Sequence, residues 1–256
     1  MRAVLASPPP TLLVIAKSPV PGRVKTRLTP PYTPEEAAEL AEAALADTLR
    51  TLGTVPAGRR LLVLDGAPGR WLPAGWEVLP QVAGGLDVRL AAAFAHAPAE
   101  VPALLVGMDT PQLSAATLAA PLAPAARAGT DAWYGPASDG GFWALGLARP
   151  TPELARRVLV GVPMSTPGTG AALLARLSGA GLRVRHLPVL TDVDTAPDAA
   201  AAAALAPAGA FAARWRSLGA GLRAAPQAAP RAQRPQASAA PAPAAPGRTD
   251  PVVEAR

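Results

Sequence analysis

The sequence predicts an α/β protein with a single, mainly parallel sheet that has mixed edges and is sandwiched by helices. Two observations carry this prediction. Short apolar runs rich in Leu, Val and Ile recur along the chain, as at residues 12–16 and 103–106, and such runs are typical of strands buried on both faces. Segments with the apolar spacing of helices separate these runs. Alternating strands and helices imply parallel pairing through right-handed crossovers.

The first helix has the clearest start signal. Thr33 can cap it, Pro34 suits the first helical position, and Glu36 completes a capping box, so we expect a helix to about residue 52. Further strands are expected at 60–65, 76–81, 102–109, 132–136, 142–147 and 183–190, and further helices from 87, at 114–128, at 152–160, at 169–177 and from 196. Pro121 and Pro124 should break or kink the helix at 114–128.

Composition limits the kinds of function. The chain has 256 residues, of which 50% are hydrophobic, and no cysteine. Disulfides, thiolate metal sites and cysteine nucleophiles are therefore excluded. The first apolar run is only five residues long before Lys17 interrupts it, which fits neither a signal peptide nor a membrane span. We expect a soluble, cytoplasmic protein without membrane contact.

The positive charge is concentrated at the C-terminal end. The net charge is +6, and residues 207–256 carry seven arginines against two acids, so the preceding residues are nearly neutral. We therefore expect a flexible leader at 1–10, a catalytic domain at 11–206, and a mostly disordered Ala/Pro/Arg-rich tail at 207–256. Nucleic-acid binding is not expected, because the dispersed arginines lack interleaved aromatic residues. The sequence leaves the oligomeric state open.

A basic loop follows the first predicted strand. It holds Lys17, Ser18, Arg23, Lys25 and Arg27, and its two lysines are the only ones in a chain with 22 arginines. A compact, flexible ammonium can meet phosphate as a point charge, so the pattern favours a phosphate-binding loop. The alternative is two solvated surface lysines.

Polar residues also follow the other predicted strands. In open α/β sheets, ligands bind outside the carboxyl ends of the strands. Gln81 and Gly84, Asp109, Asp139 with Gly140 and Gly141, and Asp192 with Asp194 all come at such ends. Carboxylates opposite basic groups suit a nucleotide phosphate and a hard divalent cation, and Mg²⁺ or Mn²⁺ is favoured over zinc because there is no Cys and there are only two His.

Several of these residues have a simpler interpretation. Asp109 and Asp139 can serve turns, Gln81 can be a solvated loop residue, and Asp194 can cap the helix that follows it. Asp192 is therefore the preferred second metal ligand beside Asp109. His96 and His186 are interpreted as structural. No hydrolase triad order, P-loop or dinucleotide fingerprint is present.

Four motifs together resemble a known bacterial family: residues 16–28, residues 107–111, the Gly-Pro-Ala-Ser-Asp-Gly-Gly-Phe segment at 135–142, and Asp-Val-Asp-Thr at 192–195. The family comprises transferases of the glycosyltransferase-A type, often labelled radical-SAM/selenodomain-associated or arsenosugar-biosynthesis glycosyltransferases. It is similar to 2-phospho-lactate guanylyltransferase and to the molybdenum-cofactor guanylyl- and cytidylyltransferases. The resemblance spans about residues 12–206 and implies a glycosyltransferase-A or nucleotide-diphospho-sugar transferase-like fold.

The resemblance also implies roles for residues. Lys17, Arg23, Lys25 and Arg27 would contact nucleotide phosphates, Asp109 and Asp192 would hold the metal, and Asp139, Gly140 and Gly141 would line the acceptor side. Asp109 and Asp139 are the expected catalytic residues; Ser18, Gln81 and Gly84 complete the expected nucleotide site. The chain departs from the family at residues 84–89, where we expect Gly-Asp-Leu-Gly-x-Arg, and at Met164, where Trp is common.

The expected function is thus metal-dependent transfer from a nucleotide sugar to a small acceptor. A nucleotidyltransferase that uses an NTP and releases pyrophosphate needs nearly the same site and is the alternative. A third hypothesis is a non-catalytic nucleotide-binding protein whose arginine tail recruits an anionic partner.

Overall fold

The computed structural model of this chain describes residues 8–123 and 128–224. Its centre is one seven-stranded sheet with the order β3-β2-β1-β4-β6-β5-β7. The strands are β1 (Thr11–Lys17), β2 (Arg59–Asp65), β3 (Glu77–Pro80), β4 (Ala103–Val106), β5 (Ala132–Pro136), β6 (Phe142–Leu147) and β7 (Val184–His186).

The pairing confirms a mainly parallel sheet. β1 pairs in parallel with β2 and β4, β2 with β3, and β5 with β7, whereas β6 runs antiparallel to both β4 and β5. β1 lies in the middle of the parallel part, and Leu12, Leu13 and Val14 are fully buried there. The carboxyl ends of β1, β2, β3 and β4 consequently meet at one edge, and the turn between β5 and β6 returns to the same edge.

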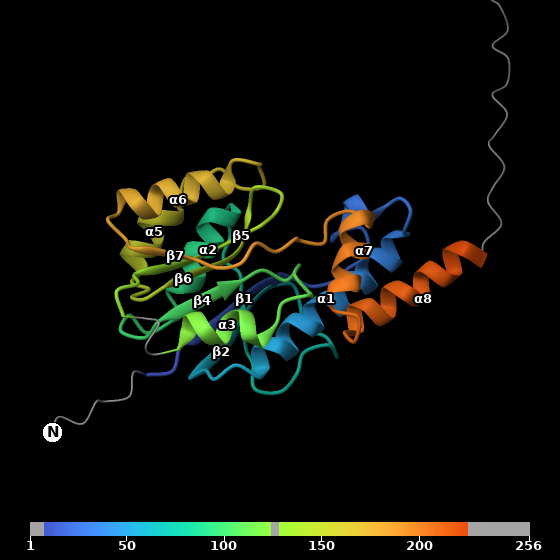
Figure 1. Cartoon of the computed structure of the whole chain (residues 1–256), viewed down its shortest axis with the longest axis horizontal. Helices are drawn as coiled ribbons and strands as arrows, with labels where there is room; N and C mark the ends of the chain where they lie inside the picture. The colour runs from blue at the N-terminus through green and yellow to red at the C-terminus, as the bar shows by residue number, and fades with distance from the viewer. Residues whose placement is uncertain (1–7, 124–127, 225–256) are drawn as a thin grey trace, which may run out of the picture.

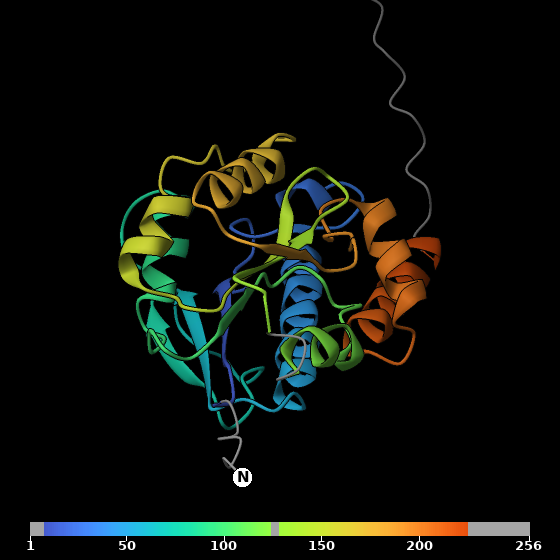
Figure 2. The same ribbon diagram turned by 60° about the vertical axis from the view of Figure 1, so that its left-hand side comes forward.

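Helices cover both faces of the sheet (Figures 1 and 2). On one face, α1 (Pro34–Gly53) and α3 (Ala115–Leu122) pack on a core that includes Leu49, Leu118 and Trp143. On the other face, α2 (Leu86–Phe94), α5 (Pro152–Leu159) and α6 (Thr169–Gly179) bury Phe94 and Leu173, among other residues. The predicted helix–sheet–helix sandwich is confirmed. No helix in the described part of the chain combines the length and the apolar character that crossing a membrane would require.

Two of the predicted helices, the first and the one from residue 196, begin with a complete capping box. Thr33 Oγ1 accepts from Glu36 N (3.2 Å), and Glu36 Oε2 accepts from Thr33 N (2.8 Å) at the start of α1. Thr195 and Asp198 do the same for α7 (Ala196–Leu205). Because Thr195 is the cap of α7, Asp194 is left for another role.

The packed body extends beyond residue 206, where the sequence analysis placed its end. A further helix, α8 (Ala210–Ala224), lies against α1 and α7 and buries Phe211, Ala212 and Leu218. Its start is fixed by Asp47 of α1, whose carboxylate accepts from Ala210 N (3.0 Å) and Phe211 N (2.8 Å). Such a carboxylate satisfies free N–H groups at a helix start. Residues 225–256 of the expected tail lie outside the described residues, as do residues 1–7 of the expected leader.

Several elements are shorter than the sequence predicted, including β3 (77–80 of 76–81) and β4 (103–106 of 102–109). α3 ends at Leu122 instead of 128, because the residue before a proline, here Ala123 before Pro124, disfavours helical backbone. Residues 124–127 lie outside the described residues. β7 covers only residues 184–186 of the predicted 183–190, and contact with the β5 end resumes as a single bridge between Ala137 and Leu190.

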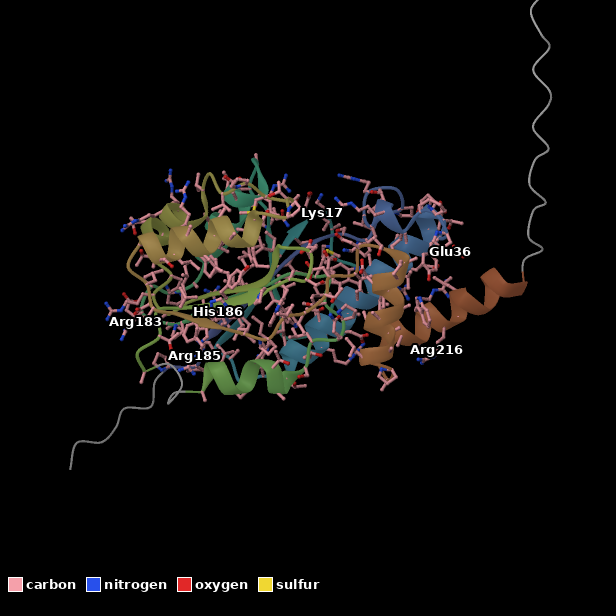
Figure 3. The ribbon with its side chains drawn as sticks, turned by 45° about the horizontal axis from the view of Figure 1, so that its top comes forward. Lys17, Glu36, Arg183, Arg185, His186 and Arg216 are labelled. Atoms are coloured by element: carbon pink, nitrogen blue, oxygen red, sulfur yellow. The ribbon has the colours of Figure 1, made fainter. Side chains whose placement is uncertain are left out.

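An exposed ion pair stabilises the short edge strand β7. Asp131, just before β5, accepts from Arg183 Nε (2.8 Å) and Arg183 N (3.0 Å). These hydrogen bonds hold the pKa of Asp131 down at about 2. Arg183, Arg185 and His186 lie together at this end of the molecule, well away from Lys17 (Figure 3).

This pair predicts a specific dependence of stability on pH. A carboxyl with a lowered folded-state pKa stabilises the fold above its unfolded pKa of about 3.9, and this contribution is lost as the pH falls toward about 2. We expect Asp131→Asn to lower the free energy of unfolding by less than about 1 kcal/mol at neutral pH, because solvent screens the pair. Denaturant unfolding of both proteins should show the difference shrinking below about pH 4. A difference that stays constant down to the lowest measurable pH would contradict this account.

Candidate functional site

A cavity of about 850 Å³ opens at the sheet edge where the strand ends meet. It contains most of the residues that the sequence analysis selected. Those that line it are Lys17, Arg23, Lys25, Arg27, Gln81, Gly84, Asp109, Asp139, Gly141 and Asp192, together with Asp194. Ser18 and Gly140 do not line it. The structure therefore brings residues from several separate segments of the chain into one place.

The basic loop is anchored by apolar residues and bent by its backbone. Val24 and Leu28 are buried, and Gly22 adopts a φ of 73°. Lys25 also has a left-handed backbone, with φ 49° and ψ 39°, immediately before the short helix η1 (Thr26–Leu28). Left-handed backbone is uncommon outside glycine and is retained where the surroundings favour it.

Lys25 is buried, so the alternative of a solvated surface lysine does not hold for it. Its side chain is 9% exposed, and its Nζ lies 2.8 Å from Asp109 Oδ1 and 3.0 Å from Asp194 Oδ1. Arg27 Nη1 donates to the other oxygen of Asp194 (3.2 Å). Burial acts to lower the pKa of Lys25, but the attraction of Asp109 and Asp194 outweighs it, so the pKa of Lys25 lies above its ordinary value.

Four aspartates form what we call the acid cluster: Asp109, Asp139, Asp192 and Asp194. Asp109 follows β4, and its carbonyl oxygen accepts from Val193 N (2.9 Å), which ties the β4 end to the segment that carries Asp192 and Asp194. Burial raises the pKa of Asp192 to about 7, and the negative charge of Asp109 is the second largest cause. Negative charge is thus in excess around Asp192.

These residues fit a divalent cation. Asp109 Oδ1 is a buried oxygen that lies 2.8 Å from the Lys25 ammonium, so it is already placed against a positive charge. Asp192 adds a second carboxyl group in surroundings that would favour a cation. No group of three or more His, Cys, Asp or Glu with metal-binding geometry occurs among residues 8–123 and 128–224. Magnesium is commonly held by one or two carboxylates together with substrate phosphates and water, so two protein ligands are sufficient.

Asp139 shapes a turn as well as lining the cavity. Its Oδ1 accepts from Gly141 N (2.8 Å), which is the turn role that the sequence left as an alternative. Gly140 next to it has a φ of 88°, and its backbone lies directly against the carbonyl of Pro167. The turn and the segment at residues 163–169 therefore form one wall, to which Met164, Ser165 and Thr166 contribute.

The predicted nucleotide residues on the β3 side are held by protein contacts. Gln81 Nε2 donates to Ala16 O (2.8 Å) and Val63 O (3.2 Å), while its Oε1 accepts from Arg89 Nη1 (3.0 Å). Arg89 also bonds Asp65 (3.1 Å) and the carbonyl of Gly84 (2.9 Å). Gln81 is thus a fixed part of the cavity wall and not a solvated loop residue. Ser18 turns away and donates to Ala67 O (2.6 Å).

Two residues that line the cavity were not assigned a site role from the sequence. Arg89 lines the cavity but was seen only as part of a segment that departs from the expected family pattern. Asp194 was weighed as a helix cap. The available signal for Asp194 was Thr195-Ala-Pro-Asp198, which already supplies a complete capping box and leaves the preceding acid free.

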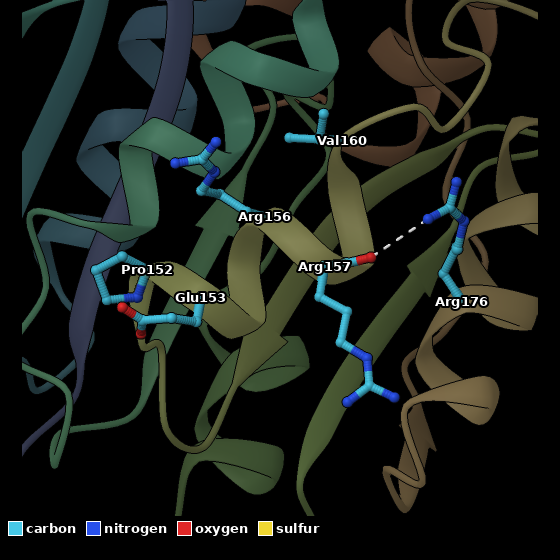
Figure 4. Close-up of a pocket in the computed structure, with 6 residues that line it drawn as sticks. All are labelled: Pro152, Glu153, Arg156, Arg157, Val160 and Arg176. Carbon is cyan, nitrogen blue, oxygen red and sulfur yellow. Dashed lines mark hydrogen bonds between the residues drawn. The ribbon is translucent and has the colours of Figure 1, made fainter.

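A second, separate hollow of about 620 Å³ lies over α5 and α6 (Figure 4). Its lining residues are Pro152, Glu153, Arg156, Arg157, Val160 and Arg176. The guanidinium groups point in different directions, and Arg176 Nη1 donates to the carbonyl of Arg157 (3.4 Å). It contains none of the residues selected from the sequence and only one carboxylate. The cavity at the strand ends is therefore the candidate site.

Comparison with solved structures confirms the predicted nucleotide-diphospho-sugar transferase-like fold. A protein from Desulfovibrio desulfuricans G20, described as a candidate nucleotide-diphospho-sugar transferase, is 22% identical with a TM-score of 0.70, and the match covers 84% of this chain and 97% of that one. A homologue of Rv0371c from Mycobacterium sp. strain JC1 is 19% identical with a TM-score of 0.51, over 77% of this chain and 97% of that one.

The family comparison covers the central part of the chain. Residues 40–166 match the family described as uncharacterized protein conserved in bacteria (DUF2064). This segment includes Gln81, Asp109 and Asp139 but begins after the basic loop and ends before Asp192. No curated protein matches the chain.

Proposed function

We propose that this protein is a metal-dependent transferase that uses a nucleotide-activated donor, and that it transfers a glycosyl group from a nucleotide sugar to a small acceptor. One observation supports the proposal: four cationic side chains of the basic loop line a single cavity together with the acid cluster, at the carboxyl ends of the strands. This combination suits a diphosphate and a divalent cation. The fold, shared with a candidate nucleotide-diphospho-sugar transferase, is consistent with it.

The proposed role of each residue follows from the charge of its side chain. Lys17, Arg23, Lys25 and Arg27 would offset the negative charge of the donor phosphates. Asp109 and Asp192 would hold Mg²⁺ or Mn²⁺, which when bound supplies positive charge to the departing diphosphate. The wall formed by the turn with Asp139 and Gly141 would receive the acceptor. Asp139 would orient the acceptor's hydroxyl group toward the donor. Holding two reactants in one cavity raises the rate by fixing their orientation.

The product of the reaction tests this proposal. The purified protein is incubated with Mn²⁺ and either a panel of nucleotide sugars or the four NTPs, together with candidate small acceptors. Release of a nucleoside diphosphate from a nucleotide sugar is the expected result. Pyrophosphate release from an NTP would instead assign nucleotidyl transfer to the same site. Release of neither product from any donor of the two classes would overturn the proposal.

A further inference from the structure

We propose that Lys25 competes with the divalent cation for Asp109: its ammonium group occupies the acid cluster when the metal is absent, and metal binding releases it toward the donor phosphates. The proposal rests on the proposed function, because it assumes that the acid cluster binds a metal and the basic loop binds phosphate. It gives Lys25 a second role and gives Asp194 a role as a positioning residue.

The position of Lys25 is that of an internal counter-ion. Its ammonium lies within 3.0 Å of oxygens from both Asp109 and Asp194, which come from segments far apart in the sequence. Two half-buried carboxylates this close together require compensating charge, and in this structure the buried lysine supplies it. A divalent cation on Asp109 Oδ1 would then lie next to a second positive charge. Because like charges repel strongly at such short distances, the two cations exclude one another from this oxygen.

The contacts of Lys25 also allow its ammonium group to move away from Asp109. Its contacts with Asp109 and Asp194 are ion pairs, and a divalent cation on Asp109 would replace the charge attraction that Lys25 supplies there. Asp194 keeps a partner in either state, since its Oδ2 already accepts from Arg27 Nη1. A released lysine has a flexible four-carbon chain and lines the same cavity as Lys17 and Arg23. Metal binding and phosphate binding would therefore be coupled through one side chain.

The two lysines of the chain offer a matched test. Lys17 also lines the cavity but forms no ion pair among the described residues. Binding of Mn²⁺ alone, measured from the electron paramagnetic resonance signal of the free ion, should tighten on the order of tenfold in Lys25→Met and stay unchanged in Lys17→Met. Equal Mn²⁺ affinity in wild type and Lys25→Met overturns the competition, provided that circular dichroism shows both to be folded.

A second measurement needs no variant. Acetic anhydride at low concentration acetylates exposed lysines faster than buried ones, and peptide mass spectrometry resolves the two sites. In the metal-free wild-type protein Lys25 should react at least about tenfold more slowly than Lys17, since its ammonium is buried and paired. Addition of Mn²⁺ should raise the Lys25 rate relative to that of Lys17. Unchanged protection of Lys25 at saturating Mn²⁺ would overturn the proposal.

Inorganic pyrophosphate with Mg²⁺ separates this inference from the proposed function. Calorimetric titration should show weaker pyrophosphate binding in both lysine variants. If wild type does not bind pyrophosphate while Lys25→Met still gains Mn²⁺ affinity, the phosphate role fails and with it the release of Lys25 toward phosphate. If pyrophosphate binds as expected while Mn²⁺ affinity is unchanged in Lys25→Met, only the competition fails.

Discussion

Asp109→Asn is expected to lower the rate of donor-dependent transfer by about 10²–10³-fold, the loss typical when one preorganised electrostatic contact to a developing charge is removed. Asparagine has nearly the same shape as aspartate but contributes no negative charge to hold a divalent cation. It also leaves Lys25 paired with Asp194 alone. The rate should no longer respond to added Mn²⁺, and this can be measured as product release across a Mn²⁺ titration.

The fold should survive this change, so the loss can be assigned to the site. The backbone carbonyl of Asp109, which accepts from Val193 N, is unaffected by the substitution. Asp131→Asn is the matched control, because Asp131 lies beside β7 and does not line the cavity. It should transfer at the wild-type rate. An Asp109→Asn protein that keeps both its rate and its response to Mn²⁺ would remove Asp109 from the metal site.

The sheet and its helix starts could be predicted because their signals are local. A buried strand appears as a short apolar run, and a capping box as two residues three apart, as at Thr33 and Glu36. The gathering of the basic loop and the acids at one edge followed from the rule that parallel strands end together. Most of the residues that line the cavity could therefore be predicted from the sequence.

The contacts between individual side chains could not be predicted from the sequence. Lys25 and Asp194 are 169 residues apart, and nothing local to either residue shows that they meet. For the same reason the sequence left a solvated Lys25 open as an alternative, although the structure buries its side chain. α8 escaped prediction because its docking depends on Asp47, which in sequence is only an acid in the middle of a helix. Its composition, rich in Ala and Arg, resembled the tail that follows it.

Gly140→Ala is expected to lower the free energy of unfolding by about 2–4 kcal/mol, because two costs combine at this position. The residue has a φ of 88°, which L-residues rarely adopt, and a Cβ placed there would clash with the carbonyl oxygen of Pro167. Backbone atoms cannot rotate away as a side chain can, so the turn and the segment at residues 163–169 would have to separate.

A second glycine isolates the contact from the backbone strain. Gly75 has a φ of 85°, nearly that of Gly140, and a Cβ added to it would meet no atom within 4 Å, so Gly75→Ala should cost only about 1–2 kcal/mol. Urea unfolding gives the free energy of unfolding that each variant loses, provided that the m-value is unchanged. The difference between the two losses measures the cost of the contact with Pro167. Because this contact joins the wall that carries Asp139 to its neighbour, Gly140→Ala should also weaken acceptor use while leaving pyrophosphate binding near wild type. Equal losses of stability in the two variants would show that the wall yields at Pro167, and Asp139 would then lack the rigid support that orienting an acceptor requires.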